Sequence, residues 1–145
     1  MKLLVKKLRG NAVIPARATK ESAGYDLSAC LDSPLVIPAG ETVKVPTGIS
    51  CAVEDCGNCV LLIYARSSTA ANKCLAPANC VGVVDSDYRG EILVPLYNRS
   101  REDKTVEPGE RIAQLVITPV LLPEVEETDL LSSTERGAGG FGSSG

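Results

Sequence analysis

The 145-residue sequence contains no histidine and no tryptophan, and it has only one phenylalanine and four tyrosines. The absence of histidine excludes Ser-His-Asp and Cys-His nucleophile systems, histidine-liganded zinc and an imidazole general base. If the protein is an enzyme, a carboxylate is therefore the expected proton acceptor. Aromatic residues make up 3% of the chain and hydrophobic residues 44%, so aliphatic side chains must fill the interior.

Long apolar runs and blocks of basic residues are also missing. The chain carries 15 Lys and Arg against 18 Asp and Glu, so it offers no basic surface for bulk nucleic-acid binding, although a small basic pocket for one nucleotide is compatible with this balance. Because charged residues follow Met1 and no long apolar stretch occurs, we expect neither a secretory signal nor a membrane span. We therefore expect an intracellular protein, cytoplasmic or nuclear, whose six cysteines are free thiols.

The apolar segments are short, rich in Val, Ile and Leu, and separated by Gly or Pro about every ten residues, which is typical of an all-β sandwich or barrel. Pro95 removes one ladder donor, so its strand is expected to be bulged or to lie at a sheet edge. The number of predicted strands suits a jelly-roll-like distorted β-barrel. The strands are expected at 3–8, 35–38, 42–45, 49–53, 60–64, 81–84, 91–97 and 111–120.

One short helix is expected over 69–74, with Ser67 or Ser68 as its N-cap. Arg66 precedes these two serines at the junction between a strand and this helix. Helix N-terminal N–H groups, two hydroxyls and a guanidinium could therefore converge on one anion. The alternative is an ordinary capped helix with a surface arginine.

The C-terminal segment 136–145 reads R-G-A-G-G-F-G-S-S-G, and glycine-rich backbone loses much entropy on ordering. It is either a flexible tail or an arm that orders on a nucleotide. In the second case Phe141 offers a stacking face, Arg136 contacts phosphate, and the glycines let backbone N–H groups approach anionic oxygens. We expect a β-barrel domain at 1–135 and a mobile arm at 136–145.

Residues 82–90, G-V-V-D-S-D-Y-R-G, connect two apolar strands through a strongly polar loop. In extended backbone Asp85 and Asp87 lie on the same side, so one carboxylate could hold a water while the other is paired. The alternative is a plain turn in which Asp87 and Arg89 form a structural ion pair.

Three other polar features each have a structural alternative. Asp26 stands between apolar residues and is either functional or a turn or cap acceptor. Gln114 lies in an apolar strand, where it is either buried with partners or faces water at an edge. Cys56-Gly57-Asn58-Cys59 lacks the second thiolate pair of a zinc site and the strand-helix context of a redox motif, so a hairpin turn is expected.

Five of these segments, in order, resemble the five motifs of the homotrimeric dUTPase (deoxyuridine 5'-triphosphate nucleotidohydrolase) family. The resemblance extends from residue 23 to the C-terminus. The second motif has Ala65 before Arg66, where the family more often has Pro or Gly, and the loop around Cys56 and Cys59 has no counterpart in the family pattern. The segments are A-G-Y-D-L-S at 23–28, A-R-S-S at 65–68, G-V-V-D-S-D-Y-R-G-E at 82–91, P-G-E-R-I-A-Q-L at 108–115 and R-G-A-G-G-F-G-S-S-G at 136–145.

The resemblance implies hydrolysis of dUTP to dUMP and pyrophosphate by water attack on the α-phosphorus, with Mg²⁺, in sites shared by three subunits. Such an enzyme lowers dUTP and supplies dUMP for thymidylate synthesis. Asp85 is implied as the water-activating carboxylate, with Asp87 structural or supporting, and the absence of histidine agrees with an aspartate base. Asp26 is implied to hold the metal through water.

The same resemblance implies the substrate contacts. Tyr88 lies against the deoxyribose and excludes a 2'-hydroxyl, and the hairpin leaves no room for a thymine methyl. Cytosine is rejected because its donor and acceptor face the wrong groups. The implied uracil contacts are Asn79, Gly82, Val83, Val84 and Leu93; the implied phosphate contacts are Arg66, Ser67, Ser68 and Gln114; the implied contacts from the arm are Arg136, Phe141, Gly142 and Ser143.

Two other classes of function remain as alternatives. A deoxycytidine triphosphate deaminase is similar in fold and arm but releases ammonia, and the third motif argues against it. A nucleotide-binding regulatory protein or a plain jelly-roll structural protein belongs to a different class, against which the five intact motifs argue. Pyrophosphate release from dUTP separates these classes.

Overall fold

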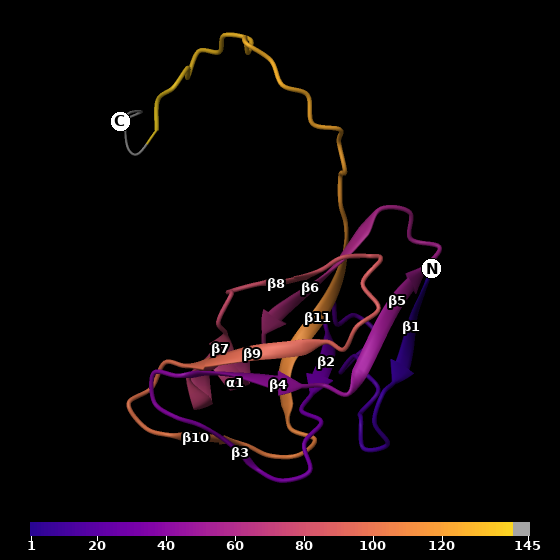
Figure 1. Ribbon diagram of the computed structural model, residues 1–145, viewed down its shortest axis with the longest axis vertical. Helices are drawn as coiled ribbons and strands as arrows, with labels where there is room; N and C mark the ends of the chain where they lie inside the picture. Colours follow the sequence, from indigo (N-terminus) through magenta and orange to yellow (C-terminus); the bar gives the residue numbers. More distant parts are fainter. Residues whose placement is uncertain (141–145) are drawn as a thin grey trace.

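The computed structural model describes residues 1–140, which form β-strands and one short helix (Figure 1). The predicted all-β class is confirmed. Within these residues the strands pair into four small sheets, ordered β1-β5, β10-β3, β2-β11-β6-β8 and β4-β9-β7, and do not close into one continuous barrel. The elements are β1 Lys2–Lys7, β2 Tyr25–Ser28, β3 Leu35–Ile37, β4 Thr42–Pro46, β5 Ile49–Glu54, β6 Cys59–Ala65, α1 Ser67–Lys73, β7 Leu75–Pro77, β8 Gly82–Val84, β9 Leu93–Asn98, β10 Lys104–Val106 and β11 Arg111–Pro119.

Each predicted strand overlaps an observed strand, and three further strands were missed. The missed strands, β2, β7 and β10, have only four, three and three residues. Such short segments show too little alternation to be recognised by their periodicity. Each owes its existence to a longer neighbour, since β11 pairs with β2, β9 with β7 and β3 with β10.

The core is aliphatic, as the scarcity of aromatic residues predicts. In β6 the buried residues Cys59, Leu61 and Ile63 alternate with less buried ones, because side chains of a strand point to opposite faces in turn. The largest fully buried side chains of the described chain are all Leu, Ile or Val. They are Leu27, Ile37, Val45, Ile49, Leu61, Leu75, Ile92, Val94, Leu96, Val106, Ile112 and Leu115.

The prediction that Pro95 lies in a bulged or edge strand is wrong. Its strand, β9, is the central strand of its sheet, and Pro95 pairs in regular register with Lys44 of β4. The Pro95 carbonyl accepts a hydrogen bond of 2.8 Å from Ala78, directly after β7 ends at Pro77. Because N–H and C=O of one residue in an antiparallel sheet face the same neighbour, the missing N–H faces the end of β7. The sheet therefore loses no ladder bond to β4.

The helix begins two residues earlier than predicted, and its predicted N-cap is wrong. The N-cap residue of α1 is Arg66, which makes no side-chain capping hydrogen bond, so neither Ser67 nor Ser68 is the cap. At its other end, Cys74 adopts a left-handed conformation with φ 56° and donates its N–H to the Thr69 carbonyl. The helix is anchored by the buried Thr69, whose hydroxyl donates to the Arg111 carbonyl of β11 at 3.3 Å.

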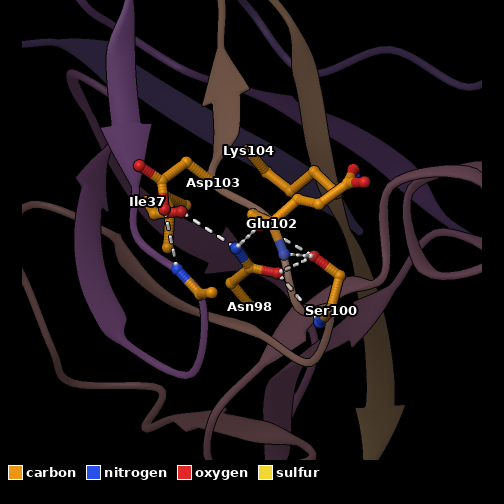
Figure 2. A network of polar contacts seen from close by, with 7 residues as sticks. Ile37, Asn98, Ser100, Glu102, Asp103 and Lys104 are labelled. Atoms are coloured by element: carbon orange, nitrogen blue, oxygen red, sulfur yellow. Dashed lines mark hydrogen bonds and ion pairs between the residues drawn. The ribbon is translucent and has the colours of Figure 1, made fainter.

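A buried polar network around Asn98 fixes the end of β9 (Figure 2). The Asn98 Nδ2 donates to the carbonyls of Ile37 and Glu102 at 2.9 and 2.8 Å. Its Oδ1 accepts from both the backbone N–H and the hydroxyl of Ser100 at 3.0 and 2.8 Å. The amide thus uses its full hydrogen-bonding capacity and joins β9, β3 and the loop that leads to β10.

Replacing this amide is expected to destabilise the fold. Asn98→Ala leaves the carbonyl of the buried Ile37 and that of Glu102 without their donor and opens a small cavity, so the free energy of unfolding should fall by about 3 kcal/mol. Urea denaturation at fixed protein concentration measures the loss. As a control, Asn72→Ala changes an exposed helical asparagine and should stay within about 0.5 kcal/mol. Equal stability of the two variants would contradict the role given to Asn98.

Beyond β11 the chain contains no helix or strand up to residue 140 and runs away from the folded body (Figure 1). This segment nevertheless carries large apolar side chains. The exposed ones are Leu121, Leu122, Val125, Leu130 and Leu131. No helix in residues 1–140 has the length and apolar character needed to cross a membrane.

Candidate functional site

The polar loop after β8 is positioned by the ladder between β8 and β6. Leu61 pairs with Val84 and Ile63 with Gly82, so Asp85 follows directly where β8 ends. The loop then turns, with the Tyr88 N–H donating to the Asp85 carbonyl at 3.1 Å. The β6–β8 pairing therefore places Asp85 at the rim of the sheet.

The alternative ion pair between Asp87 and Arg89 is not formed in the described chain. Arg89 instead donates to the carbonyls of Ser86 and Tyr88, at 2.8 and 3.0 Å. These hydrogen bonds stabilise the turn through backbone groups of the same loop. Both carboxylates, Asp85 and Asp87, remain exposed.

The loop and β9 enclose a first cavity of about 220 Å³, which we call the hairpin cavity. Tyr88 is held on its wall by a hydrogen bond of 3.2 Å from its hydroxyl to the Glu91 carbonyl. A Cβ added at Gly90 would collide with the Tyr88 ring and hydroxyl, so a larger residue there would displace this ring. Five predicted site residues meet in this cavity, whose lining is Val83, Val84, Asp85, Tyr88, Glu91, Ile92 and Leu93.

Two further predicted residues lie beside this cavity. Gly82 is buried, and a Cβ built on it would lie 3.1 Å from the Ile63 Cβ and 3.6 Å from the Asn79 Nδ2. The Asn79 side chain therefore sits against the first residue of β8. Neither Gly82 nor Asn79 lines the hairpin cavity itself, but both adjoin Val83, which does.

A second cavity, of about 400 Å³, lies on the other side of the Asp85 loop. Asp85 lines both cavities, whereas Asp87 lines only the second. We call this second space the loop-base cavity; its lining is Cys59, Val60, Val83, Asp85, Ser86, Asp87, Val120 and Leu122.

A basic site lies around the start of α1. Asp26 on β2 accepts from the Arg66 Nε at 2.7 Å and from an Arg111 guanidinium nitrogen at 3.0 Å. Arg66 also donates to the Ser68 hydroxyl at 3.1 Å. The adjoining cavity of about 230 Å³ is lined by Arg66, Ser68, Thr69, Asn72, Lys73, Glu110 and Arg111. We call it the anion pocket, since two guanidinium groups aimed by one carboxylate suit a phosphate.

Gln114 joins this region from β11. It stands in register with Asp26 of β2, and its Nε2 donates to the Ala65 carbonyl at 2.9 Å. Gly24 packs against it so closely that a Cβ there would lie 3.2 Å from the Gln114 Cβ. Gln114 is half-buried on an interior strand, so the alternative of a glutamine facing water at a sheet edge is wrong.

Other predicted residues lie apart from these cavities. Ser67 is exposed in the first turn of α1 and does not line the anion pocket. Arg136 lines none of the three cavities and donates its Nε to the Gly139 carbonyl at 2.9 Å. Phe141, Gly142 and Ser143 lie outside the described residues.

Sequence reasoning missed several residues of the site. Arg111 is separated from Asp26 by 85 positions, so their ion pair shows only in the fold. Glu91 accepts the Gly48 N–H at 2.8 Å through its carboxylate and so closes one wall of the hairpin cavity. Lys73 bonds Glu110 beside the anion pocket. The signal available for Arg111 was its place in the P-G-E-R-I-A-Q-L segment, three residues before Gln114.

The Asp85 loop and the anion pocket lie at opposite ends of β6. Continuing the β6–β8 register places Asp85 opposite Val60, whereas Arg66 follows the last residue of the strand. Six residues of extended strand separate these points by about 20 Å. Asp85 and Arg66 of one chain therefore do not meet.

Comparison with known proteins gives a family for this arrangement. The family model described as dUTPase matches residues 10–145. The deoxyuridine 5'-triphosphate nucleotidohydrolase of Aeromonas hydrophila is 43% identical over 145 residues, covering 100% of this chain and 95% of that protein. The protein of the same name from Coxiella burnetii strain Dugway is 44% identical with the same coverage.

Solved structures agree with this assignment. The dUTPase of Staphylococcus bacteriophage 80alpha, solved with dUPNHPP, shares 28% identity with a TM-score of 0.87, covering 99% of this chain and 98% of that one. A variant dUTPase from phage phi11 of S. aureus, described as coordinating a structural Mg(II) ion, shares the fold at 22% identity, a TM-score of 0.81 and coverage of 92% and 100%. The chain described here therefore belongs to the dUTPase family.

Proposed function

We propose that this protein hydrolyses dUTP to dUMP and pyrophosphate, with Asp85 activating the water that attacks the α-phosphorus. The observation that carries this proposal is the hairpin cavity, where an exposed carboxylate and a fixed tyrosine ring face one space in a chain of the dUTPase family. The further roles below follow from the contacts of the individual residues.

Asp85 is the best-placed general base. The only other acid lining the hairpin cavity, Glu91, is engaged by the Gly48 N–H. Within residues 1–140 the Asp85 carboxylate is engaged in no ion pair, and the contact recorded at Asp85 is made by its backbone carbonyl. It can therefore accept a proton from water, and the sequence contains no histidine that could do so instead.

The hairpin cavity suits a deoxyuridine. We assign the Tyr88 ring, which packs against Gly90 and bonds the Glu91 carbonyl, to support the deoxyribose and to exclude a 2'-hydroxyl. β8 is the edge strand of its sheet, so backbone groups of Val83 and its neighbours that point away from β6 are free to pair with a uracil edge. Asn79 lies beside β8 as a further polar contact, and the backbone of Leu93 closes the other side of the cavity.

The phosphate contacts come from a neighbouring copy of the chain. We assign phosphate binding to Arg66, Ser67, Ser68 and Gln114, which gather about one β6 length away from Asp85 of the same chain. A site that holds both the nucleoside and the triphosphate therefore needs two subunits, and the family resemblance makes the assembly a homotrimer. The exposed apolar residues of 120–140 support this, since such side chains need a partner surface.

The arm at 136–145 completes the proposed site, following a barrel domain at 1–135. Arg136 is assigned to the γ-phosphate, Phe141 to the uracil ring, and Gly142 and Ser143 to further substrate contacts. Arg136 is exposed, and within residues 1–140 its Nε donates to the Gly139 carbonyl, which leaves the other guanidinium N–H groups for a phosphate. Closure of such an arm excludes water other than the attacking one.

The donor set fits a magnesium ion carried by the triphosphate. Each Asp26 oxygen accepts one guanidinium N–H, and a carboxylate has about four acceptor positions, so each oxygen can still accept from a water. No cluster of three or more Cys, Asp or Glu residues that could hold a metal occurs in residues 1–140. Mg²⁺ keeps several waters and binds substrate phosphates, so Asp26 would hold it through water. When bound, it supplies neutralisation of the phosphate charge.

A substrate panel tests the proposed function. Pyrophosphate release from dUTP should exceed release from dCTP by about 100-fold or more, because a mismatched base edge leaves buried polar groups unpaired. Release from dTTP and UTP should also be lower, because the hairpin excludes the thymine methyl and Tyr88 excludes the 2'-hydroxyl. The measurement is pyrophosphate and ammonia production with each nucleotide and Mg²⁺. Ammonia from dCTP would instead indicate a deaminase, and tight dUTP binding without turnover would indicate a regulatory binding protein.

A further inference from the structure

The turn between β5 and β6 brings two thiols together. β5 ends at Glu54 and β6 begins at Cys59, and the turn between them carries Asp55 and Gly57 in left-handed conformations, with φ of 57° and 60°. Two such residues curl the backbone tightly around Cys56. Cys56 and Cys59 lie three positions apart on either side of Gly57 in this bend, and their side chains are close enough to interact.

The two thiols differ in access. Cys59 is only 4% exposed, and its burial, together with the hydrogen bond and charge of Cys56, raises its pKa to about 11. Cys56 is half-buried and open to small molecules. Cys56 is therefore the thiol that meets a reagent first, and Cys59 is protected behind it.

A metal site does not account for the pair. A structural zinc takes four ligands, and no group of three or more Cys, Asp or Glu residues suited to a metal is found in the described part of the chain. All six cysteines are free thiols, as the sequence predicts, so no existing disulfide competes for either sulfur. Two neighbouring thiols without a third ligand can react with each other through a mixed disulfide.

We propose that Cys56 and Cys59 form a reversible dithiol–disulfide site that is oxidised by small-molecule disulfides. The Cys56 thiolate attacks one sulfur of the disulfide R–S–S–R and expels R–S⁻. The Cys59 thiol then loses its proton to solvent and attacks the Cys56 sulfur, which expels the second R–S⁻. Two protein thiols are thereby oxidised to one disulfide, and one small disulfide is reduced to two thiols.

The site adjoins two segments to which we have assigned function. Cys59 lines the loop-base cavity together with Asp85 and Asp87. The Asn58 carbonyl, inside the turn, accepts the Val120 N–H at 3.2 Å, where the chain leaves β11 for the arm. A disulfide across this turn stiffens the support of both the Asp85 loop and the start of the arm.

Oxidised glutathione tests the proposal on the full-length, fully reduced protein. We expect it to link Cys56 to Cys59 in one peptide, with the loss of two hydrogens and no glutathione adduct on either of these two thiols. Cys59→Ser should stop at a stable glutathione adduct on Cys56, because the resolving thiol is gone. Dithiothreitol should restore both thiols in the wild type.

Cys80→Ser is the matched control. Cys80 is exposed and far along the chain from the turn, so its replacement should leave the internal disulfide unchanged. Cys56→Ser should abolish the paired loss of thiols. The proposal is overturned if Cys56→Ser still loses a thiol pair, or if the wild type retains a glutathione adduct on Cys56 beside a free Cys59.

Discussion

Asp85→Asn is expected to lower kcat for dUTP by about 10³-fold while leaving the affinity for the nucleotide nearly unchanged. The amide keeps the size and polarity of the side chain but cannot take a proton from water. In the wild type the Asp85 carboxylate is exposed at the rim of the hairpin cavity and forms no ion pair in the described chain, so folding does not depend on it. Steady-state pyrophosphate release gives kcat, and titration with a non-hydrolysable dUTP analogue gives the affinity.

Asp87→Asn is the matched control for this prediction. It makes the same change of charge two residues away, on a side chain that lines only the loop-base cavity. We expect its kcat to stay within a few-fold of the wild-type value. Equal losses of kcat in both variants would show that the charge of the loop matters and not a base at position 85. Near-native turnover of Asp85→Asn would show that Asp85 is not the general base.

The sequence predicted the strand class well because long strands carry their own period. In β11, nine residues of mostly apolar sequence identify a buried strand without reference to any partner. β7, with three residues ending in Pro77, carries no such period and exists because β9 pairs with it. Pro95 suggests a bulged or edge strand because the sequence shows that one backbone N–H is missing. It does not show toward which neighbouring strand that N–H would point.

The site divides in the same way. The loop at 82–91 is continuous in sequence, so Asp85, Tyr88 and their apolar neighbours were found together. The anion pocket is assembled from β2, the start of α1 and β11, and the pairing of Asp26 with both Arg66 and Arg111 depends on the register of those strands. The distance between the two sites is also a property of the fold, because it is the length of β6.

That distance leads to the second prediction, that two inactive variants restore each other. Asp85→Asn changes the Asp85 loop at one end of β6, and Arg66→Ala changes the anion pocket at the other end. If each site takes Asp85 from one chain and Arg66 from another, random mixing at equal amounts gives half of the sites an intact Asp85 and half of those an intact Arg66. We expect activity of about a quarter of the wild-type value per site, from parents that are nearly inactive.

The mixture is made by refolding differently tagged chains together. Purification on both tags in turn isolates the mixed oligomers, and the unfractionated mixture gives the activity per site. The control is an equal mixture of wild type with the double variant Asp85→Asn/Arg66→Ala. Shared sites again require two intact chains and give about a quarter of the wild-type activity, whereas sites within one chain give about half. No recovery in the first mixture together with half activity in the second would place Asp85 and Arg66 in one chain's site, which would contradict the separation of the two cavities along β6.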